Sequence, residues 1–180
     1  MNLAEWMQKY RSNVGNILLV VVLILATPDA VSITIGFFVL LSGALFRAWC
    51  AGYISDDDFP RVGPYSLSRN PMAFGNLLIG IGVAVGGNNL YVFLIFIVYY
   101  LAFFPVSMIR RQRKLKDKYG KDYEVWKKRT NVFVPRIKKI VPGEYNISSY
   151  MKSKEYRVIY FSLFVIAVLV FKFIRSAGMP

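Results

Sequence analysis

Four or five apolar runs, separated by polar segments, constrain the fold of this chain more than any other feature of its sequence. They cover approximately residues 14–27, 31–53, 71–87, 90–109 and 156–174. Most approach the roughly 20 apolar residues that cross a bilayer as a helix, whereas the first is short enough to be a tilted or partial span. An apolar content of 56% and a mean hydropathy of +0.42 are typical of membrane proteins. The sequence therefore predicts an all-α integral membrane protein, a single domain over residues 1–180 with about five transmembrane helices.

Positive charge is distributed unevenly along the chain, which has a net charge of +13. Sixteen of the 23 lysine and arginine residues fall between residues 110 and 157, and the links at 28–30 and 86–89 contain none. By the positive-inside rule, this asymmetry predicts a multi-pass protein with a cytoplasmic N-terminus, a cytoplasmic basic loop and an external C-terminus. Residues 1–11 lack the cleavage pattern of a signal peptide and are predicted to be an interfacial start.

The basic face of the protein has two possible partners. It would attract anionic lipid headgroups, at roughly 1 kcal/mol per nearby lysine or arginine. Nucleic acid is the alternative, but no recognition motif accompanies the charge. We therefore expect a bilayer with anionic headgroups as the partner, and no nucleic acid.

Histidine is absent from the chain, and cysteine occurs once, as Cys50 within an apolar run. The chain thus lacks the commonest general base, the commonest metal ligand and any Ser-His or Cys-His nucleophilic pair. We expect no zinc site and no internal disulfide. Cys50 is predicted to be a small core residue.

The link GPYSLSRNP, residues 63–71, is the most informative polar segment between two apolar runs. Asn70 is predicted to cap the following helix through its side-chain oxygen, and Pro71 suits the first helical turn. Free backbone N–H groups, the helix dipole and Arg69 would together favour an anion such as a carboxylate or phosphate. The same sequence also fits an ordinary turn into a membrane helix, with no ligand.

A charged helix is predicted to continue beyond the fourth apolar run, from residue 108 to about residue 128. It carries an approximate stripe of apolar and aromatic side chains at Ile109, Leu115, Tyr119, Tyr123 and Trp126. The stripe would either rest on the membrane surface or fold back over the start of the 71–87 helix. Residues 110–136 are thus predicted to be a basic cytoplasmic extension between the last two spans, and residues 147–155 a surface segment.

Two sequence elements stand in order on either side of one predicted membrane hairpin. The first is Gly63-Pro64-Tyr65, then Arg69-Asn70-Pro71, then Gly75. The second is Leu115, then Tyr119-Gly120, Tyr123, Trp126 and Pro135. Together they resemble the membrane methyltransferases typified by isoprenylcysteine carboxyl methyltransferase and phosphatidylethanolamine N-methyltransferase, which usually have leucine, Phe-Gly, two aromatics and a proline in the second element. The resemblance covers roughly residues 45–136, about half of the chain.

Two departures from the family pattern fall on binding positions. Where the family normally has Arg-His-Pro, this chain has Asn70, which forms hydrogen bonds but does not carry a proton as histidine does. Where the family usually has a Glu-Glu pair that helps to hold the cationic end of the cofactor, this chain has Gln112 and Arg113. The aspartates at 56–58 are either a solvated link or a substitute for that lost negative charge.

The resemblance implies methyl transfer from S-adenosylmethionine to a lipid or lipidated substrate that enters laterally from the bilayer. It gives the catalytic position to Arg69, which would supply positive charge to the cofactor carboxylate or to an anionic acceptor. The cofactor-binding residues that it implies are Gly63, Pro64, Tyr65, Asn70, Pro71, Gln112, Arg113, Leu115 and Tyr119, with Tyr123 and Trp126 packing a lid. In-line methyl transfer can proceed by positioning and desolvation, without histidine or metal.

Two other functions stay open at this point. The missing histidine and glutamates also fit a non-catalytic family member with a degenerate site, which would bind a lipid or a partner protein. A membrane reductase related to sterol reductases shares the pattern, although this chain leaves too little length for a separate nicotinamide site.

Overall fold

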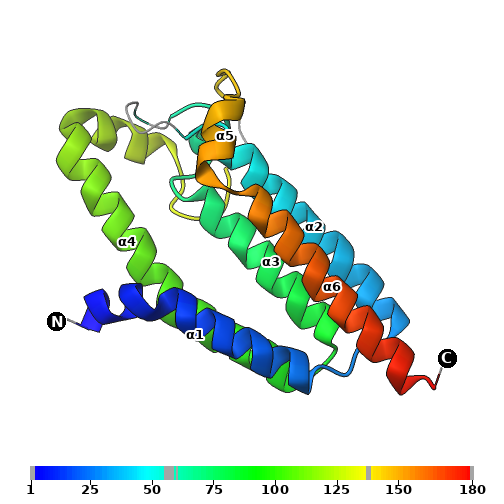
Figure 1. The fold of residues 1–180 in the computed structure, drawn as a ribbon. Helices are drawn as coiled ribbons and strands as arrows, with labels where there is room; N and C mark the ends of the chain where they lie inside the picture. The colour runs from blue at the N-terminus through cyan, green and yellow to red at the C-terminus, as the bar shows by residue number, and fades with distance from the viewer. Residues whose placement is uncertain (1–2, 55–58, 60, 137–138, 179–180) are drawn as a thin grey trace.

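The computed structural model describes residues 3–54, 59, 61–136 and 139–178 of the chain. The described part contains six α-helices and one short 3-10 turn: α1 (Leu3–Leu25), α2 (Ala30–Ala51), η1 (Gly63–Ser66), α3 (Pro71–Gly87), α4 (Leu90–Arg129), α5 (Ile147–Ser153) and α6 (Tyr156–Ser176). The prediction of an all-α protein is confirmed (Figure 1). The predicted surface segment at 147–155 contains α5, none of whose residues is buried.

Three helices of the described chain, α2, α4 and α6, are long and apolar enough to cross a membrane. The apolar helix α3 is shorter, with 17 residues, and α1 is not among these candidate spans. The prediction of about five spans is therefore met in part. The predicted first span, 14–27, is the second half of a longer helix that begins at Leu3. Trp6 and Tyr10 pack one helical turn apart in its added first half, with ring centres 5.2 Å apart.

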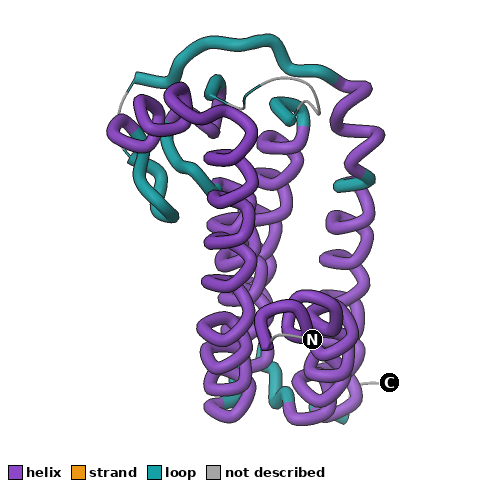
Figure 2. Tube along the Cα trace, turned by 90° about the vertical axis from the view of Figure 1, so that its left-hand side faces the viewer, coloured by secondary structure: helices purple, strands orange, loops and turns teal. Residues whose placement is uncertain are grey.

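Helices α2, α3 and α6 lie side by side as a bundle (Figures 1 and 2). Glycines bring two of the backbones together: a Cβ atom at Gly36 would lie 2.7 Å from the Gly82 carbonyl oxygen. One at Gly43 would lie 2.8 Å from the Gly75 carbonyl oxygen, so both positions require glycine. Cys50 is buried, as predicted for a core residue. The apolar core between α2, α6 and the end of α1 contains Ala26, Ile33, Leu40, Val165 and Leu169.

Helix α1 lies antiparallel along the first half of α4 and forms a second unit with it, the α1–α4 pair. Hydrogen bonds join the pair at both ends. The Asn89 side-chain amide donates to the Leu25 carbonyl at 3.0 Å, and the Arg11 guanidinium donates to the Ser107 hydroxyl at 2.9 Å. Farther along, α4 leans away from α3 toward the end of the molecule at which α3 and α6 begin (Figure 1). We call this end the site end.

Helix α4 changes direction at Gly120, whose φ of 47° and ψ of −110° are not helical. Glycine adopts this left-handed backbone at little cost, whereas other residues do so rarely. The corner turns residues 121–136, which we call the returning segment, back toward the start of α3. The structure thus continues the helix past residue 108, as the charged stripe predicts, and its last part folds back over the start of α3, which was one of the two predicted placements.

A buried ion pair ties the start of α6 to α2. The Arg47 guanidinium donates to the Glu155 carboxylate oxygens at 2.6 and 2.9 Å, and also to the side-chain oxygen of Asn76 on α3. The Arg47 and Glu155 side chains are only 14% and 11% exposed. Because an unpaired charge at such a buried position is costly, each of the two groups depends on the other.

We predict that Glu155→Gln lowers the free energy of unfolding by about 3–5 kcal/mol, because it leaves Arg47 buried without a counter-charge. Thermal unfolding of the detergent-purified protein measures the loss. The matched control is Glu124→Gln, which removes exposed pairs with Lys116 and Lys127 and should cost less than about 1 kcal/mol. Equal losses in the two variants would contradict the structural role of the buried pair.

Candidate functional site

The link before α3 is hydrogen-bonded to the returning segment. Five bonds of 2.8 to 3.0 Å join them: Trp126 Nε1–H to the Tyr65 carbonyl, Arg69 N–H to the Asn131 carbonyl, Ser68 Oγ–H to the Phe133 carbonyl, Asn70 Nδ2–H to the Val132 carbonyl and Arg136 N–H to the Leu67 carbonyl. The two motif elements are therefore one site in space, although a helical hairpin separates them in the chain.

Asn70 holds the returning segment and does not cap α3 with its side chain. It occupies the N-cap position, and Pro71 the first helical position, but no side-chain hydrogen bond caps the helix. Its side-chain amide donates instead to the Val132 carbonyl at 2.9 Å. The prediction of a side-chain cap at Asn70 is therefore wrong. The N–H groups of Ala73 and Phe74 donate to the Asn70 carbonyl, so few backbone donors remain there for an anion.

The guanidinium of Arg69 is buried, with 6% of the residue exposed. Its Nε and Nη1 groups have no hydrogen-bond partner among the described residues. Leaving a charged donor unsatisfied in the interior costs more than the about 1–3 kcal/mol of a neutral group. An anion would remove this cost, and the planar fork of a guanidinium suits a carboxylate or a phosphate.

Tyr65 supplies a second unsatisfied donor. The residue is completely buried, and its hydroxyl has no partner in the described part of the chain. Burial raises the pKa of Tyr65 to about 12, and the positive charge of nearby Arg111 opposes this shift only in part. The hydroxyl therefore stays protonated at neutral pH and can donate. The Arg111 guanidinium lies 5.4 Å from the centre of the Tyr65 ring, within cation–π range.

An aromatic cluster packs the returning segment against the chain that precedes η1. The ring of Phe59 lies 4.6 Å from that of Tyr119 and 5.0 Å from that of Trp126, centre to centre. Tyr123 is buried, and its hydroxyl donates to the side-chain oxygen of Gln112 at 3.2 Å. These contacts keep the returning segment close to the link and cover the site with apolar surface.

The structure brings together most, but not all, of the predicted site residues. The buried ones are Gly63, Pro64, Tyr65, Arg69, Asn70 and Pro71. Gln112, Leu115 and Tyr119 are half-buried on α4, whereas Arg113 is exposed. The aspartates at 56–58 lie outside the described residues.

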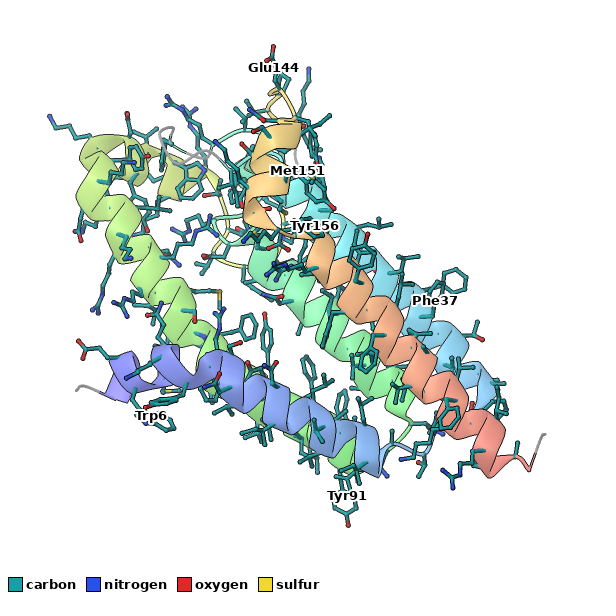
Figure 3. The ribbon with its side chains drawn as sticks, in the orientation of Figure 1. Trp6, Phe37, Tyr91, Glu144, Met151 and Tyr156 are labelled. Atoms are coloured by element: carbon teal, nitrogen blue, oxygen red, sulfur yellow. The ribbon has the colours of Figure 1, made fainter. Side chains whose placement is uncertain are left out.

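Two adjoining cavities lie between the α1–α4 pair and α3, whose side chains face one another across this space (Figure 3). A polar cavity of about 260 Å³ is lined by Arg11, Arg111 and Asn70, among others. An apolar cavity of about 340 Å³ is lined mainly by aliphatic and aromatic side chains. The residues that line both cavities are Arg11, Arg47, Asn76 and Phe104. The two cavities therefore adjoin at these four residues.

The sequence patterns did not identify Arg11 or Arg111 as residues of this space. Both were treated only as part of the basic, cytoplasmic charge. The sequence of α4 does contain a pattern that could have identified Arg111. Its residues 104, 107, 108 and 111 follow an i, i+3, i+4, i+7 spacing, which places them on one helix face, and all of them line the polar cavity. Its partner face on α1 carries Gln8 and Arg11, three residues apart.

Residues 46–122 match the profile of the family described as PEMT, phospholipid methyltransferase. This part of the chain is therefore similar to the phospholipid methyltransferases, and the family resemblance drawn from the two motif elements is confirmed. The matched region contains the link, α3 and α4 as far as its corner, whereas α1 and most of the returning segment lie outside it.

Two curated relatives are similar to this chain. One is the nickel-cobalt-cadmium resistance protein NccN of Alcaligenes xylosoxydans xylosoxydans, 25% identical over 112 residues, which cover 61% of this chain and 52% of the relative. The other is the cobalt-zinc-cadmium resistance protein CzcN of Cupriavidus metallidurans, 28% identical over 108 residues, which cover 58% of this chain and 50% of the relative. The chain thus spans about half the length of these relatives. No solved structure matches it significantly.

We predict that Gly120→Ala displaces the returning segment from the link. A Cβ atom there would meet no atom within 4 Å, so the cost is that of the left-handed backbone alone, about 1–2 kcal/mol. Limited proteolysis should cut residues 121–136 faster than in the wild type. Gly178→Ala is the control, since Gly178 has a φ of +65° and equally open surroundings but lies near the C-terminus. An unchanged cleavage rate in Gly120→Ala would contradict the role of the corner.

Proposed function

We propose that this protein transfers a methyl group from S-adenosylmethionine to a lipid or lipidated substrate at the membrane. The observation that carries the proposal is the buried Arg69 guanidinium, which has two unpartnered donors and lies within the region similar to the phospholipid methyltransferases. The next residue, Asn70, lines the polar cavity, which shares four lining residues with the apolar one. A site for a charged cofactor and a space for an apolar acceptor thus adjoin.

The unsatisfied donors fit the amino-acid end of S-adenosylmethionine. Its carboxylate would accept hydrogen bonds from Arg69 Nε and Nη1, and the Tyr65 hydroxyl is a further free donor. The link and the returning segment would hold the cofactor, with Gln112 and Tyr119 contributing from α4. When bound, the cofactor supplies a methyl group activated by a cationic sulfur.

The residues of this chain would act by positioning the reactants and excluding water. The buried Tyr65 and the rings of Phe59, Tyr119 and Trp126 surround the link with apolar surface. Excluding water strengthens the electrostatic interaction between Arg69 and a bound anion. An acceptor that presents its own lone pair needs no basic side chain, so the lack of histidine is compatible with the reaction.

The acceptor would enter from the bilayer, and the cofactor from the aqueous side. The apolar cavity lies between α1, α3 and α4, and α4 is one of the candidate membrane spans. We extend the topology to five crossings with the N-terminus and the site end in the cytoplasm, because 16 of the 23 basic residues fall between residues 110 and 157.

A non-catalytic, lipid- or partner-binding role is the second candidate. The observation that favours it is the state of Gln112, which stands where the family has a glutamate and is already bonded to Tyr123. The exposed Arg113 replaces the other glutamate with a cation. The two relatives are named for resistance to metal ions, and those names specify no methyl transfer.

Calorimetric titration with S-adenosylmethionine and with its demethylated product tests the first candidate. We expect both to bind, and Arg69→Met to weaken binding about tenfold to a hundredfold, as expected for the loss of a charged hydrogen bond. The unliganded Arg69→Met protein should unfold at an equal or higher temperature, because it no longer buries an unpaired charge. Arg175→Met, an exposed change in the last turn of α6, serves as the control and should bind normally. Absence of binding both in detergent and in lipid nanodiscs would refute the methyltransferase proposal.

Restoring the family residues separates the two candidates. We expect the triple variant Asn70→His, Gln112→Glu, Arg113→Glu to bind S-adenosylmethionine no more tightly than the wild type, because Asn70 and Gln112 already bond to Val132 and Tyr123. Methyl transfer into extracted lipids should likewise not increase. A gain of activity would instead show that the natural site is degenerate.

A further inference from the structure

We propose that the two adjoining cavities bind a lipid with a net negative headgroup, held at the headgroup by Arg11 and Arg111. The hydrocarbon chain of the lipid would occupy the apolar cavity. The binding of this lipid is independent of the proposed function. Only its role as the methyl acceptor rests on that function.

The apolar cavity has the lining that a hydrocarbon chain requires. It lies between the α1–α4 pair and α3, and its lining includes Leu18, Leu19, Ile79, Val83, Ile95 and Phe96. Concave and mainly apolar spaces with a few polar groups are typical ligand sites. Hydrocarbon contacts do not distinguish one headgroup from another, so selectivity has to come from the polar end.

The polar end carries positive charge that the described residues do not neutralise. Arg11 donates to the Ser107 hydroxyl and lies 5.7 Å from the centre of the Phe104 ring. Arg111 lies against the ring of Tyr65. In the described part of the chain, no carboxylate lines either cavity or pairs with these two arginines. Both are half-buried, so salt screens their charges less than it screens exposed charges.

Arg47 differs from these two residues although it also lines both cavities. Its charge is neutralised by Glu155, so its role is to hold α6. Arg11 comes from α1 and Arg111 from α4, and they meet at one cavity. Basic pockets between membrane helices bind anionic headgroups, and guanidinium groups bind phosphate and carboxylate in bidentate fashion. A headgroup with only an ammonium at this position would be repelled.

The proposed headgroup site adjoins the proposed cofactor site, because Arg111 packs on the Tyr65 ring, but the two sites use different arginines. Arg69 lines neither cavity, whereas its neighbour Asn70 lines the polar one. The two anions would therefore bind to different arginines, the headgroup to Arg11 and Arg111 and the cofactor carboxylate to Arg69. Because Arg11 lies outside residues 46–122, part of the headgroup selectivity would reside in a helix that the matched region does not include.

Native mass spectrometry of the full chain released from mixed-lipid nanodiscs tests the proposal without cofactor. The probes are phosphatidylglycerol and phosphatidylethanolamine with identical acyl chains. We expect phosphatidylglycerol to be retained about tenfold or more over phosphatidylethanolamine, as two arginine contacts imply. Arg11→Gln and Arg111→Gln should each reduce this preference several-fold, and Arg11→Lys should keep most of it. Lys128→Gln, an exposed change on the returning segment, is the control and should leave it unchanged.

Equal retention of the two lipids would overturn the proposal. Loss of the preference in Lys128→Gln would also overturn it, because general surface charge would then be the cause. Excess inorganic phosphate should not displace phosphatidylglycerol. Displacement would refute a site that binds the hydrocarbon chain of the lipid as well as its headgroup. Since no S-adenosylmethionine is present, selective lipid binding would stand even if calorimetry showed no cofactor binding, and only the methyltransferase proposal would then fail.

Discussion

The hydrogen bonds between the link and the returning segment are the constraint on which the rest of the site depends. Each is worth only about 1 kcal/mol, but together they fix the backbone from Tyr65 to Asn70 against residues that follow the corner of α4. The residues after the corner bond to the backbone of the link and to the Asn70 amide. None of them bonds to Nε or Nη1 of the Arg69 guanidinium. The same packing that orders the link therefore leaves one buried cation ready for an external anion.

The arginines at the site end differ in burial and in whether a carboxylate neutralises their charge. Arg47 is paired with Glu155 and joins three helices. Arg69 is buried with two donors unsatisfied, which lowers stability and is the basis of the proposed anion site. Arg11 and Arg111 are half-buried at the wall of a cavity. The residue type alone does not separate these roles, since burial and the nearest carboxylate decide among them.

Periodicity and turn residues predicted the helices well, because those signals are local. The start of α3 at Pro71 and its end at Gly87 agree with the predicted apolar run, and so does the start of α6. The side chain of Asn70 was mispredicted because a carbonyl more than sixty residues away competes with local capping. The meeting of Arg11 and Arg111 was not predicted, since it depends on how α1 packs on α4. Contacts between residues far apart in the chain leave no local pattern in the sequence.

Helix α4 lines both cavities and, past Gly120, continues into the returning segment. It is anchored to α1 along its first half and to the link through Trp126 at its far end. The two parts of α4 thus have separate tasks, because the first lines the cavities and the second holds the link. They meet only at Gly120, so the backbone freedom of this one residue decides how far a movement of α4 at the cavities would be passed on to the link.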